Sequence, residues 1–297
     1  LAGLPASPTK YSPFSYPEAA KARQVLVLDR MKELKMINQD EYNKAKEEHL
    51  NYYVNKAQIK APHFVFWVRN LLMQKYGIKK VTEGGLKITT TLDTGIQKMA
   101  EATVSAELAK LEKYKVSNGA ALITEPKTGQ ILAMVGSVDY FSDKIDGKYN
   151  VTTALRQPGS SIKPINYAVG IETGKITAAS VIYDNPTCFA QPGQRNYCPT
   201  NYGGAYHGLQ NIRTSLASSL NIAAVKVLKI NGLETFVASA SAMGLSTFKN
   251  ASDYGLSLTL GGGEVTMTDM ATAYGVLANM GIRQDLNPIM KVVDKNG

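Results

Sequence analysis

The sequence predicts an α+β fold in which an antiparallel sheet is combined with clustered helices. Residues 119–137 form two apolar runs joined by Glu-Pro-Lys-Thr-Gly, the pattern of a β-hairpin with Pro126 at the second turn position. Most of the chain that follows alternates helical apolar spacing with polar, glycine-rich loops such as 201–208 and 260–265. Local strand pairing with helices gathered beside it is typical of α+β domains.

Two helices are predicted near the start of the chain. After four prolines in the first 17 residues, apolar residues recur on one helical face, namely Val25, Leu26, Leu28, Met31 and Leu34. A second helix is expected from about Asn38, which is suited to an N-cap and is followed by acidic residues.

Residues 58–115 predict a small connecting module without obvious chemistry. A helix over 61–76 should end at Gly77, which suits a left-handed C-cap. Residues 84–93 alternate apolar and polar positions, the period of a half-buried strand, and an amphipathic helix follows.

The composition is that of a globular protein and excludes several functional classes. Of 297 residues, 44% are hydrophobic and 19% charged, and no run of 18 apolar residues predicts a membrane span. The net charge of +9 comes from scattered basic residues without a basic stripe, so we expect no nucleic-acid partner and favour an anionic surface or polymer.

No cofactor or metal is expected from the motifs. His49, His63 and His207 are far apart and none has a second ligand at zinc-site spacing. The glycine-rich 260–265 segment lacks the phosphate-loop pattern and is interpreted as a tight turn before a helix. Tyr202, Gly203 and His207 either line a cleft rim or only pack their loop, and loop packing is the favoured interpretation.

Cys188 and Cys198 flank a Pro-Gly turn and could close a short loop. A disulfide in an oxidising compartment and two unpaired thiols are both open interpretations.

The Ser-x-x-Lys spacing occurs three times, starting at Ser7, Ser160 and Ser246. A serine becomes nucleophilic when a neighbouring base takes its proton, and residues i and i+3 share one helix face. Prolines surround Ser7, and Ser246 lies in a predicted loop or single turn. Ser160 opens a helical pattern with Lys163 one turn later, whereas Ser161 has Pro164 at that position. The spacing therefore selects Ser160 over Ser161.

An alternative for Ser160 is a simple helix N-cap, with Lys163 solvated. A second motif shifts the balance: Ser219-Leu220-Asn221 is the only Ser-x-Asn in the chain and lies between two helical segments. A Ser-Lys pair combined with a Ser-x-Asn loop is the set found in serine β-lactamases and penicillin-binding proteins.

Five blocks of the sequence resemble class A penicillin-binding proteins, which polymerise and cross-link peptidoglycan. These blocks are 81–93, 119–137, 156–172, 213–227 and 258–281, and residues 1–31 resemble the end of the family's glycosyltransferase domain. The resemblance implies a penicillin-binding-protein or serine β-lactamase-like transpeptidase fold. It also implies three parts: a glycosyltransferase remnant (1–57), a linker (58–115) and the larger first part of a transpeptidase domain (116–297).

The resemblance implies roles for four residues in serine D,D-transpeptidation. Ser160 would be the acyl-ester nucleophile, Lys163 the general base, Ser219 the proton relay and Asn221 a substrate ligand. The expected partners are stem peptides ending in D-Ala-D-Ala and β-lactam antibiotics. The expected location is the extracytoplasmic face of the bacterial membrane, with the anchor in a longer parent protein.

Two departures from the family pattern weaken this prediction. The glycosyltransferase's catalytic glutamates and lipid anchor, expected before Leu1, are missing from this sequence. No Lys-Thr-Gly motif follows Ser219, and Lys127-Thr128-Gly129 precedes Ser160 in the predicted hairpin turn, so we interpret it as a turn. The sequence therefore resembles an internal fragment, for which weak acylation or none is expected. A non-catalytic β-lactam- or muropeptide-binding module is the main alternative. A serine β-lactamase fits less well because it would lack the glycosyltransferase remnant.

Overall fold

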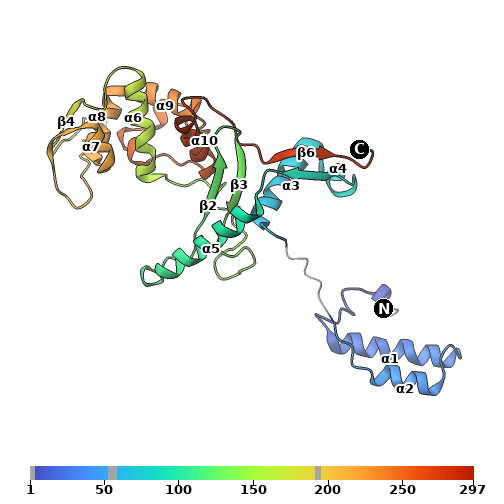
Figure 1. Cartoon of the computed structure of the whole chain (residues 1–297). Helices are drawn as coiled ribbons and strands as arrows, with labels where there is room; N and C mark the ends of the chain where they lie inside the picture. Colours follow the sequence, from blue (N-terminus) through green and yellow to red (C-terminus); the bar gives the residue numbers. More distant parts are fainter. Residues whose placement is uncertain (1–3, 53–58, 191–194) are drawn as a thin grey trace. The chain divides into compact units, whose positions relative to one another are not determined.

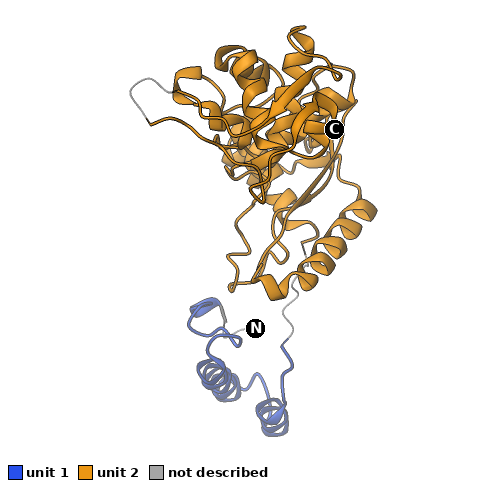
Figure 2. Cartoon of the chain, turned by 90° about the vertical axis from the view of Figure 1, so that its left-hand side faces the viewer, with its two compact units in different colours: residues 1–58 blue, residues 59–297 orange. Residues whose placement is uncertain are grey.

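The computed structural model describes residues 4–52, 59–190 and 195–297 (Figure 1). Its contacts divide the chain into two compact units, residues 1–58 and 59–297 (Figure 2). The expected boundary at residues 57 and 58 lies outside the described residues. Almost all of the expected linker belongs to the second unit, and the three-part domain assignment stays a prediction. Among the described helices, none has the length and apolar character needed to cross a membrane.

The first unit contains the two helices that the sequence predicts. After the short 3-10 helix η1 (Leu4–Ala6) come α1 (Pro17–Glu33) and α2 (Gln39–Glu47). Asn38 caps α2 in a capping box with Glu41, each side chain accepting the other residue's backbone N–H. No residue of α1 is buried, and Leu26 remains 56% exposed. The apolar pattern predicted the helix, but a pair of helices is too small to cover its face.

The start of the second unit packs against residues much later in the chain. It contains α3 (Pro62–Tyr76), α4 (Ile78–Glu83), β1 (Lys87–Thr90), α5 (Thr94–Lys110) and η2 (Glu112–Tyr114). Gly77 ends α3, as predicted, and its φ of 83° is positive, but its ψ of 151° is not that of the expected left-handed C-cap. Strand β1 pairs antiparallel with β6 (Ile289–Val293), and α5 packs on β3. Residues of the expected linker therefore share a sheet with the last strand.

The predicted hairpin is present as β2 (Ala121–Glu125) and β3 (Gln130–Val135), paired antiparallel. Lys127, Thr128 and Gly129 lie in its turn, where the backbone N–H of Gly129 donates to the carbonyl of Glu125. Gly129 has a φ of 70°, and a Cβ there would collide with the carbonyl oxygen of Asp285. The turn therefore requires glycine for structural reasons, as the interpretation of this motif predicts.

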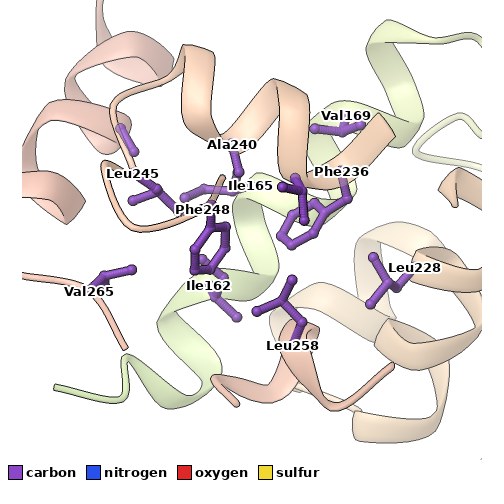
Figure 3. Close-up of a cluster of buried hydrophobic side chains, with 12 residues drawn as sticks. Ile162, Ile165, Val169, Leu228, Phe236, Ala240, Leu245, Phe248, Leu258 and Val265 are labelled. Atoms are coloured by element: carbon purple, nitrogen blue, oxygen red, sulfur yellow. The ribbon is translucent and has the colours of Figure 1, made fainter. Parts of the chain in front are cut away.

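The helical part of the second unit surrounds the main core. It comprises η3 (Gly159–Ile162), α6 (Lys163–Glu172), α7 (Ile212–Ala217), α8 (Asn221–Asn231), α9 (Leu233–Ala242), η4 (Ala251–Asp253), η5 (Leu256–Leu260) and α10 (Met267–Ala278). Figure 3 shows Ile162 and Ile165 pointing into a cluster that includes Phe236, Phe248 and Leu258. Ile162 and Ile165 are fully buried. These side chains hold the start of α6 firmly on the core.

The sheet arrangement differs in one respect from the sequence prediction. Within the described residues there are three two-stranded antiparallel sheets, and the third pairs β4 (Val181–Asp184) with β5 (Gly208–Asn211). These two strands were not predicted from the sequence. Each has only four residues, and the Gly-Leu-Gln-Asn of β5 contains no β-branched or aromatic residue that would mark a strand.

Candidate active site

Ser160 lies in the single 3-10 turn that leads into α6. The sequence pattern predicts a helix start at Ser160, but the α-helix begins at Lys163. Pro164 has no N–H with which to bond the carbonyl of Ser160, and the N–H of Lys163 donates to that carbonyl instead. Ser160 is exposed while the adjacent Ile162 is fully buried, so a buried anchor presents an accessible hydroxyl.

The neighbouring Ser161 is occupied by local contacts. Its hydroxyl donates to the carbonyl of Pro158 at 2.7 Å, and its own carbonyl accepts from the hydroxyl of Tyr274 at 2.8 Å. By contrast, the hydroxyl of Ser160 has no hydrogen bond among the described residues. The hydroxyl of Ser161 is therefore engaged, and the selection of Ser160 over Ser161 stays a prediction.

The glycine-rich segment 260–265 packs closely against the backbone next to Ser160. Gly261 has a φ of 91°, and a Cβ on it would collide with the backbone N of Gly159. Four residues further on, Val265 exchanges two backbone hydrogen bonds of 2.9 Å with Arg156. The segment is therefore a turn before α10, as predicted, and it also fixes the residues that carry the candidate nucleophile.

Lys163 is the central charged group of the site. Only 1% of the residue is exposed. Its Nζ donates to the carbonyl of Ser219 at 2.7 Å, to the hydroxyl of Ser219 at 3.1 Å and to Oδ1 of Asn221 at 2.6 Å. Burial lowers the pKa of Lys163 from its usual 10.5 to about 8. The amine is thus tuned toward the pH range in which it can act as a base.

The Ser-x-Asn segment forms the sharp turn between α7 and α8. Ser219 has a φ of 52°, a left-handed conformation that is uncommon for serine, and both its oxygens contact Lys163. Leu220 is buried and holds the turn in a core cluster. The amide of Asn221 has a fixed orientation, because its Nδ2 donates to the carbonyl of Thr200 at 2.8 Å while Oδ1 faces Lys163.

The structure therefore brings three of the four predicted residues into direct contact: Lys163, Ser219 and Asn221. Ser160 lies one helical turn before Lys163, and the two described side chains do not hydrogen-bond to each other. The hydroxyls of Ser160 and Ser219 both belong to exposed residues. The buried amine of Lys163 is thus in contact with Ser219, and Ser160 lies three residues before Lys163 in the chain.

Cys188 and Cys198 form a disulfide, with sulfur atoms 2.04 Å apart. Inside the closed loop, Phe189 and Tyr197 exchange two backbone hydrogen bonds. The Pro-Gly turn that the cysteines flank, at residues 192 and 193, lies outside the described residues. The loop leads directly to Thr200, which holds Asn221.

The 201–208 segment also contacts the site, through a residue that the sequence analysis did not single out. Asn201 accepts the backbone N–H of Asn221 at 2.8 Å, and it donates to the buried Asp184. His207 binds the same carboxylate, whereas Tyr202 is fully exposed. The residues involved are 17 to 23 positions apart in the sequence, so no local pattern could have identified them.

Comparison with known proteins relates the chain to a known family. Residues 119–296 match the family described as "Penicillin binding protein transpeptidase domain". Penicillin-binding protein 2D of Bacillus subtilis (strain 168) is 32% identical over 304 residues, which cover 100% of this chain and 42% of that protein. The chain thus spans less than half the length of this curated relative.

Two solved structures share the fold. Penicillin-binding protein 1A of Haemophilus influenzae aligns with 100% of this chain and 57% of its own, at a TM-score of 0.82 and 23% identity. The PonA1 protein of Mycobacterium tuberculosis, in complex with penicillin V, aligns with 80% of this chain and 64% of its own. Its TM-score is 0.65 and its identity 22%. At these identities the likeness establishes the fold alone.

Proposed function

The chain belongs to the penicillin-binding protein transpeptidase domain family, and from this membership and the geometry at Lys163 we propose that it carries the acylation site of a serine D,D-transpeptidase. Ser160 is the nucleophile, Lys163 the general base, Ser219 the proton relay and Asn221 a ligand of the substrate's peptide group. The observation that carries the proposal is the buried Lys163, whose Nζ contacts both other motif residues.

The hydrogen bonds of Lys163 suggest how the base works. A neutral amine has two N–H groups and one lone pair, and two of the three present contacts are short, those to the carbonyl of Ser219 and to Asn221. Both can persist after deprotonation. The hydrogen bond that is lost on deprotonation is the longest one, from Nζ of Lys163 to the hydroxyl of Ser219 at 3.1 Å. The lone pair of the neutral amine can then accept a proton from the hydroxyl of Ser160 or of Ser219.

The proposed reaction proceeds through an ester on Ser160. The hydroxyl oxygen attacks the carbonyl carbon of the penultimate D-Ala while Lys163 takes its proton. The peptide bond to the terminal D-Ala then breaks, and the proton passes through Ser219 to the departing amine. An amine of a second stem peptide completes the cross-link, whereas water gives carboxypeptidase activity. The backbone N–H of Ser160, at the start of η3, can donate to the developing oxyanion.

The wider function follows from the relatives rather than from this chain alone. We propose that the full-length protein also polymerises glycan through a glycosyltransferase domain and is anchored in the cytoplasmic membrane. The active site would then lie on the extracytoplasmic side. The Cys188–Cys198 disulfide favours such an oxidising location. The PonA1 complex with penicillin V supports β-lactams as ligands of this site.

Labelling with a fluorescent penicillin tests the proposal. In the full-length protein we expect a covalent adduct that peptide mapping assigns to Ser160. Ser160→Ala should abolish the adduct, while the matched variant Ser161→Ala should keep it because the Ser161 hydroxyl binds only Pro158. Labelling that survives Ser160→Ala would contradict the assignment.

A non-catalytic β-lactam- or muropeptide-binding module is the second candidate. The observation that favours it is that all three N–H groups of Lys163 already have acceptors, none of which is Ser160. Reaction with a D-Ala-D-Ala stem peptide separates the two functions. Release of free D-Ala supports the transpeptidase, whereas binding without release supports the module.

A further inference from the structure

A buried carboxylate, Asp184, is connected through Asn201 to the Ser-x-Asn turn by hydrogen bonds. Asp184 ends β4 and is 0% exposed. It accepts the side-chain amide of Asn201 at 2.9 Å on each oxygen, and the backbone N–H and Nδ1 of His207, both at 2.9 Å. Burial alone would raise the pKa of Asp184, but the bonds from Asn201 and His207 outweigh it and keep this pKa below its usual 3.8.

The charge on Asp184 fixes the orientation of Asn201. A carboxylate is only an acceptor, so the NH₂ end of the Asn201 side chain must face it. The carbonyl end then points to the start of α8, where it accepts the N–H of Asn221 at 2.8 Å and of Ile222 at 3.3 Å. These N–H groups have no partner within their own helix. Asn201 is itself only 5% exposed, so a rotated amide would leave buried polar groups unpaired.

Asn221 is therefore held at two points by consecutive residues. Asn201 binds its backbone, and Thr200 accepts its side-chain Nδ2 at 2.8 Å. The remaining polar atom, Oδ1, contacts Nζ of Lys163 at 2.6 Å. A second link lies beside the first: Lys226 of α8 donates to the carbonyl of Tyr183 and to Asn185, the two residues that flank Asp184.

We propose that Asp184 and Asn201 are positioning residues of the acylation site, which set the place of Asn221 and, through it, of the Lys163 amine. His207 completes the carboxylate's hydrogen bonds and has the same purpose. This inference rests on the proposed function, because its consequence is the rate at which Ser160 is acylated. None of the three residues is expected to touch the reacting atoms.

The test compares Asn201→Ala with a matched cap variant, Asp93→Ala, in the full-length protein. Asp93 also accepts two backbone N–H groups at a helix start, those of Gly95 and Ile96 at the start of α5, but it does not contact the site. Asn201→Ala should lower the second-order rate constant of acylation by a penicillin between about tenfold and a hundredfold, the scale of a small misplacement of reacting groups. Asp93→Ala should leave that constant within about twofold while lowering the melting temperature.

A double variant shows whether the effect comes from hydrogen-bond complementarity. Asp184→Asn alone sets two amide groups against each other and should slow acylation about as much as Asn201→Ala. Combining Asp184→Asn with Asn201→Asp restores a carboxylate–amide pair with an acceptor toward α8, and should recover at least about tenfold of the lost rate. If Asn201→Ala does not fold, this comparison of Asp184→Asn with the double variant decides the matter.

Amide hydrogen exchange supplies a readout that does not depend on acylation. Exchange at Asn221 and Ile222 should be at least about tenfold faster in Asn201→Ala than in the unchanged protein. Acylation of Asn201→Ala at the unchanged rate, or an equal loss in Asp93→Ala, would overturn the inference. If the unchanged protein is not acylated at all, the proposed function fails instead. Unchanged exchange at both amides then overturns the positioning role as well.

Discussion

Two stretches of this chain have the same Ser-x-x-Lys spacing and end in different environments. Ser160 and Lys163 enclose the fully buried Ile162, and Ser246 and Lys249 enclose the fully buried Phe248. In both, the residue before the lysine anchors the segment in the same core cluster. The difference is the lysine: Lys163 is buried among three acceptors, whereas Lys249 is exposed.

The serines differ as well. Ser246 donates to the carboxylate of Asp269 at 3.0 Å, while the exposed hydroxyl of Ser160 has no hydrogen bond to any residue that the structure describes. The Ser-x-x-Lys spacing therefore only places the serine and the lysine on the same side of a helical turn. The chemistry comes from a second segment, Ser219–Asn221, that covers one of the two lysines and leaves the other in solvent.

The largest effect on acylation is expected from replacing Lys163, with the same replacement at Lys249 as the control. Lys163→Met removes the proposed base and should slow acylation of Ser160 by about 10²- to 10⁴-fold, the usual contribution of general base catalysis. Lys249→Met should change the rate by less than about twofold, because Lys249 is exposed and outside the site. Stopped-flow measurement with a fluorescent penicillin checks both. Similar rates for the two variants would contradict the distinction drawn between the motifs.

The two Ser-x-x-Lys stretches also show how far the site could be predicted from the sequence. Ser160, Lys163 and the Ser-x-Asn triplet are local patterns. Helical context selected Ser160 among the three Ser-x-x-Lys matches, and the Ser-x-Asn triplet with the family resemblance then favoured a nucleophile over a helix cap. Hairpin β2–β3 and the cap at Asn38 were likewise predicted from local turn and cap signals. Strands β4 and β5 were not, because they are stabilised by pairing over more than 20 residues.

The supporting residues show the same limit. Asp184 and Asn201 have no distinctive neighbours in sequence, and their importance appears only when β4, the 200–207 segment and the start of α8 meet. Local patterns thus predicted the groups that we propose to react, while the groups that hold them depend on tertiary contacts.

The pH dependence of acylation should report the pKa of Lys163. Only the neutral amine can accept a proton, so a pKa of about 8 means that roughly a tenth of the molecules are competent at pH 7. The acylation rate constant should therefore rise by about tenfold per pH unit below pH 7 and level off above pH 8. A series of measurements from pH 6 to pH 9 checks this, and a flat profile across that range would contradict the assignment of Lys163 as the base.

A smaller effect on acylation is expected from replacing Gly261, which lies against the backbone of Gly159, next to Ser160. In Gly261→Ala the new Cβ collides with the backbone of Gly159, so the segment carrying Ser160 must move. We expect about tenfold slower acylation. Gly281→Ala is the matched control, because Gly281 has a similar φ of 88° but nothing within 4 Å of its Cβ position.

The left-handed backbone conformation should cost both glycine variants about 1–2 kcal/mol of unfolding free energy, and the collision with Gly159 should add to this cost in Gly261→Ala alone. Only Gly261→Ala should also lose acylation rate. Equal acylation rates at matched stability would show that the contact between Gly261 and Gly159 does not position the nucleophile.

The smallest effect on acylation is expected from the disulfide, which lies farthest along the chain of contacts to Lys163. Cys188 and Cys198 close a loop with a sequence separation of 10, and the chain-entropy relation gives about 3 kcal/mol for a loop of this size. Replacing both with serine should lower the free energy of unfolding by about that amount, measured by urea denaturation. Acylation in the folded protein should fall by less than about threefold, since Asp184 and Asn201 still hold Asn221. As a control, a reductant should destabilise the unchanged protein and leave the double-serine variant unaffected. A hundredfold loss of acylation in the double-serine variant would contradict this expectation and show that the disulfide loop helps to position Lys163.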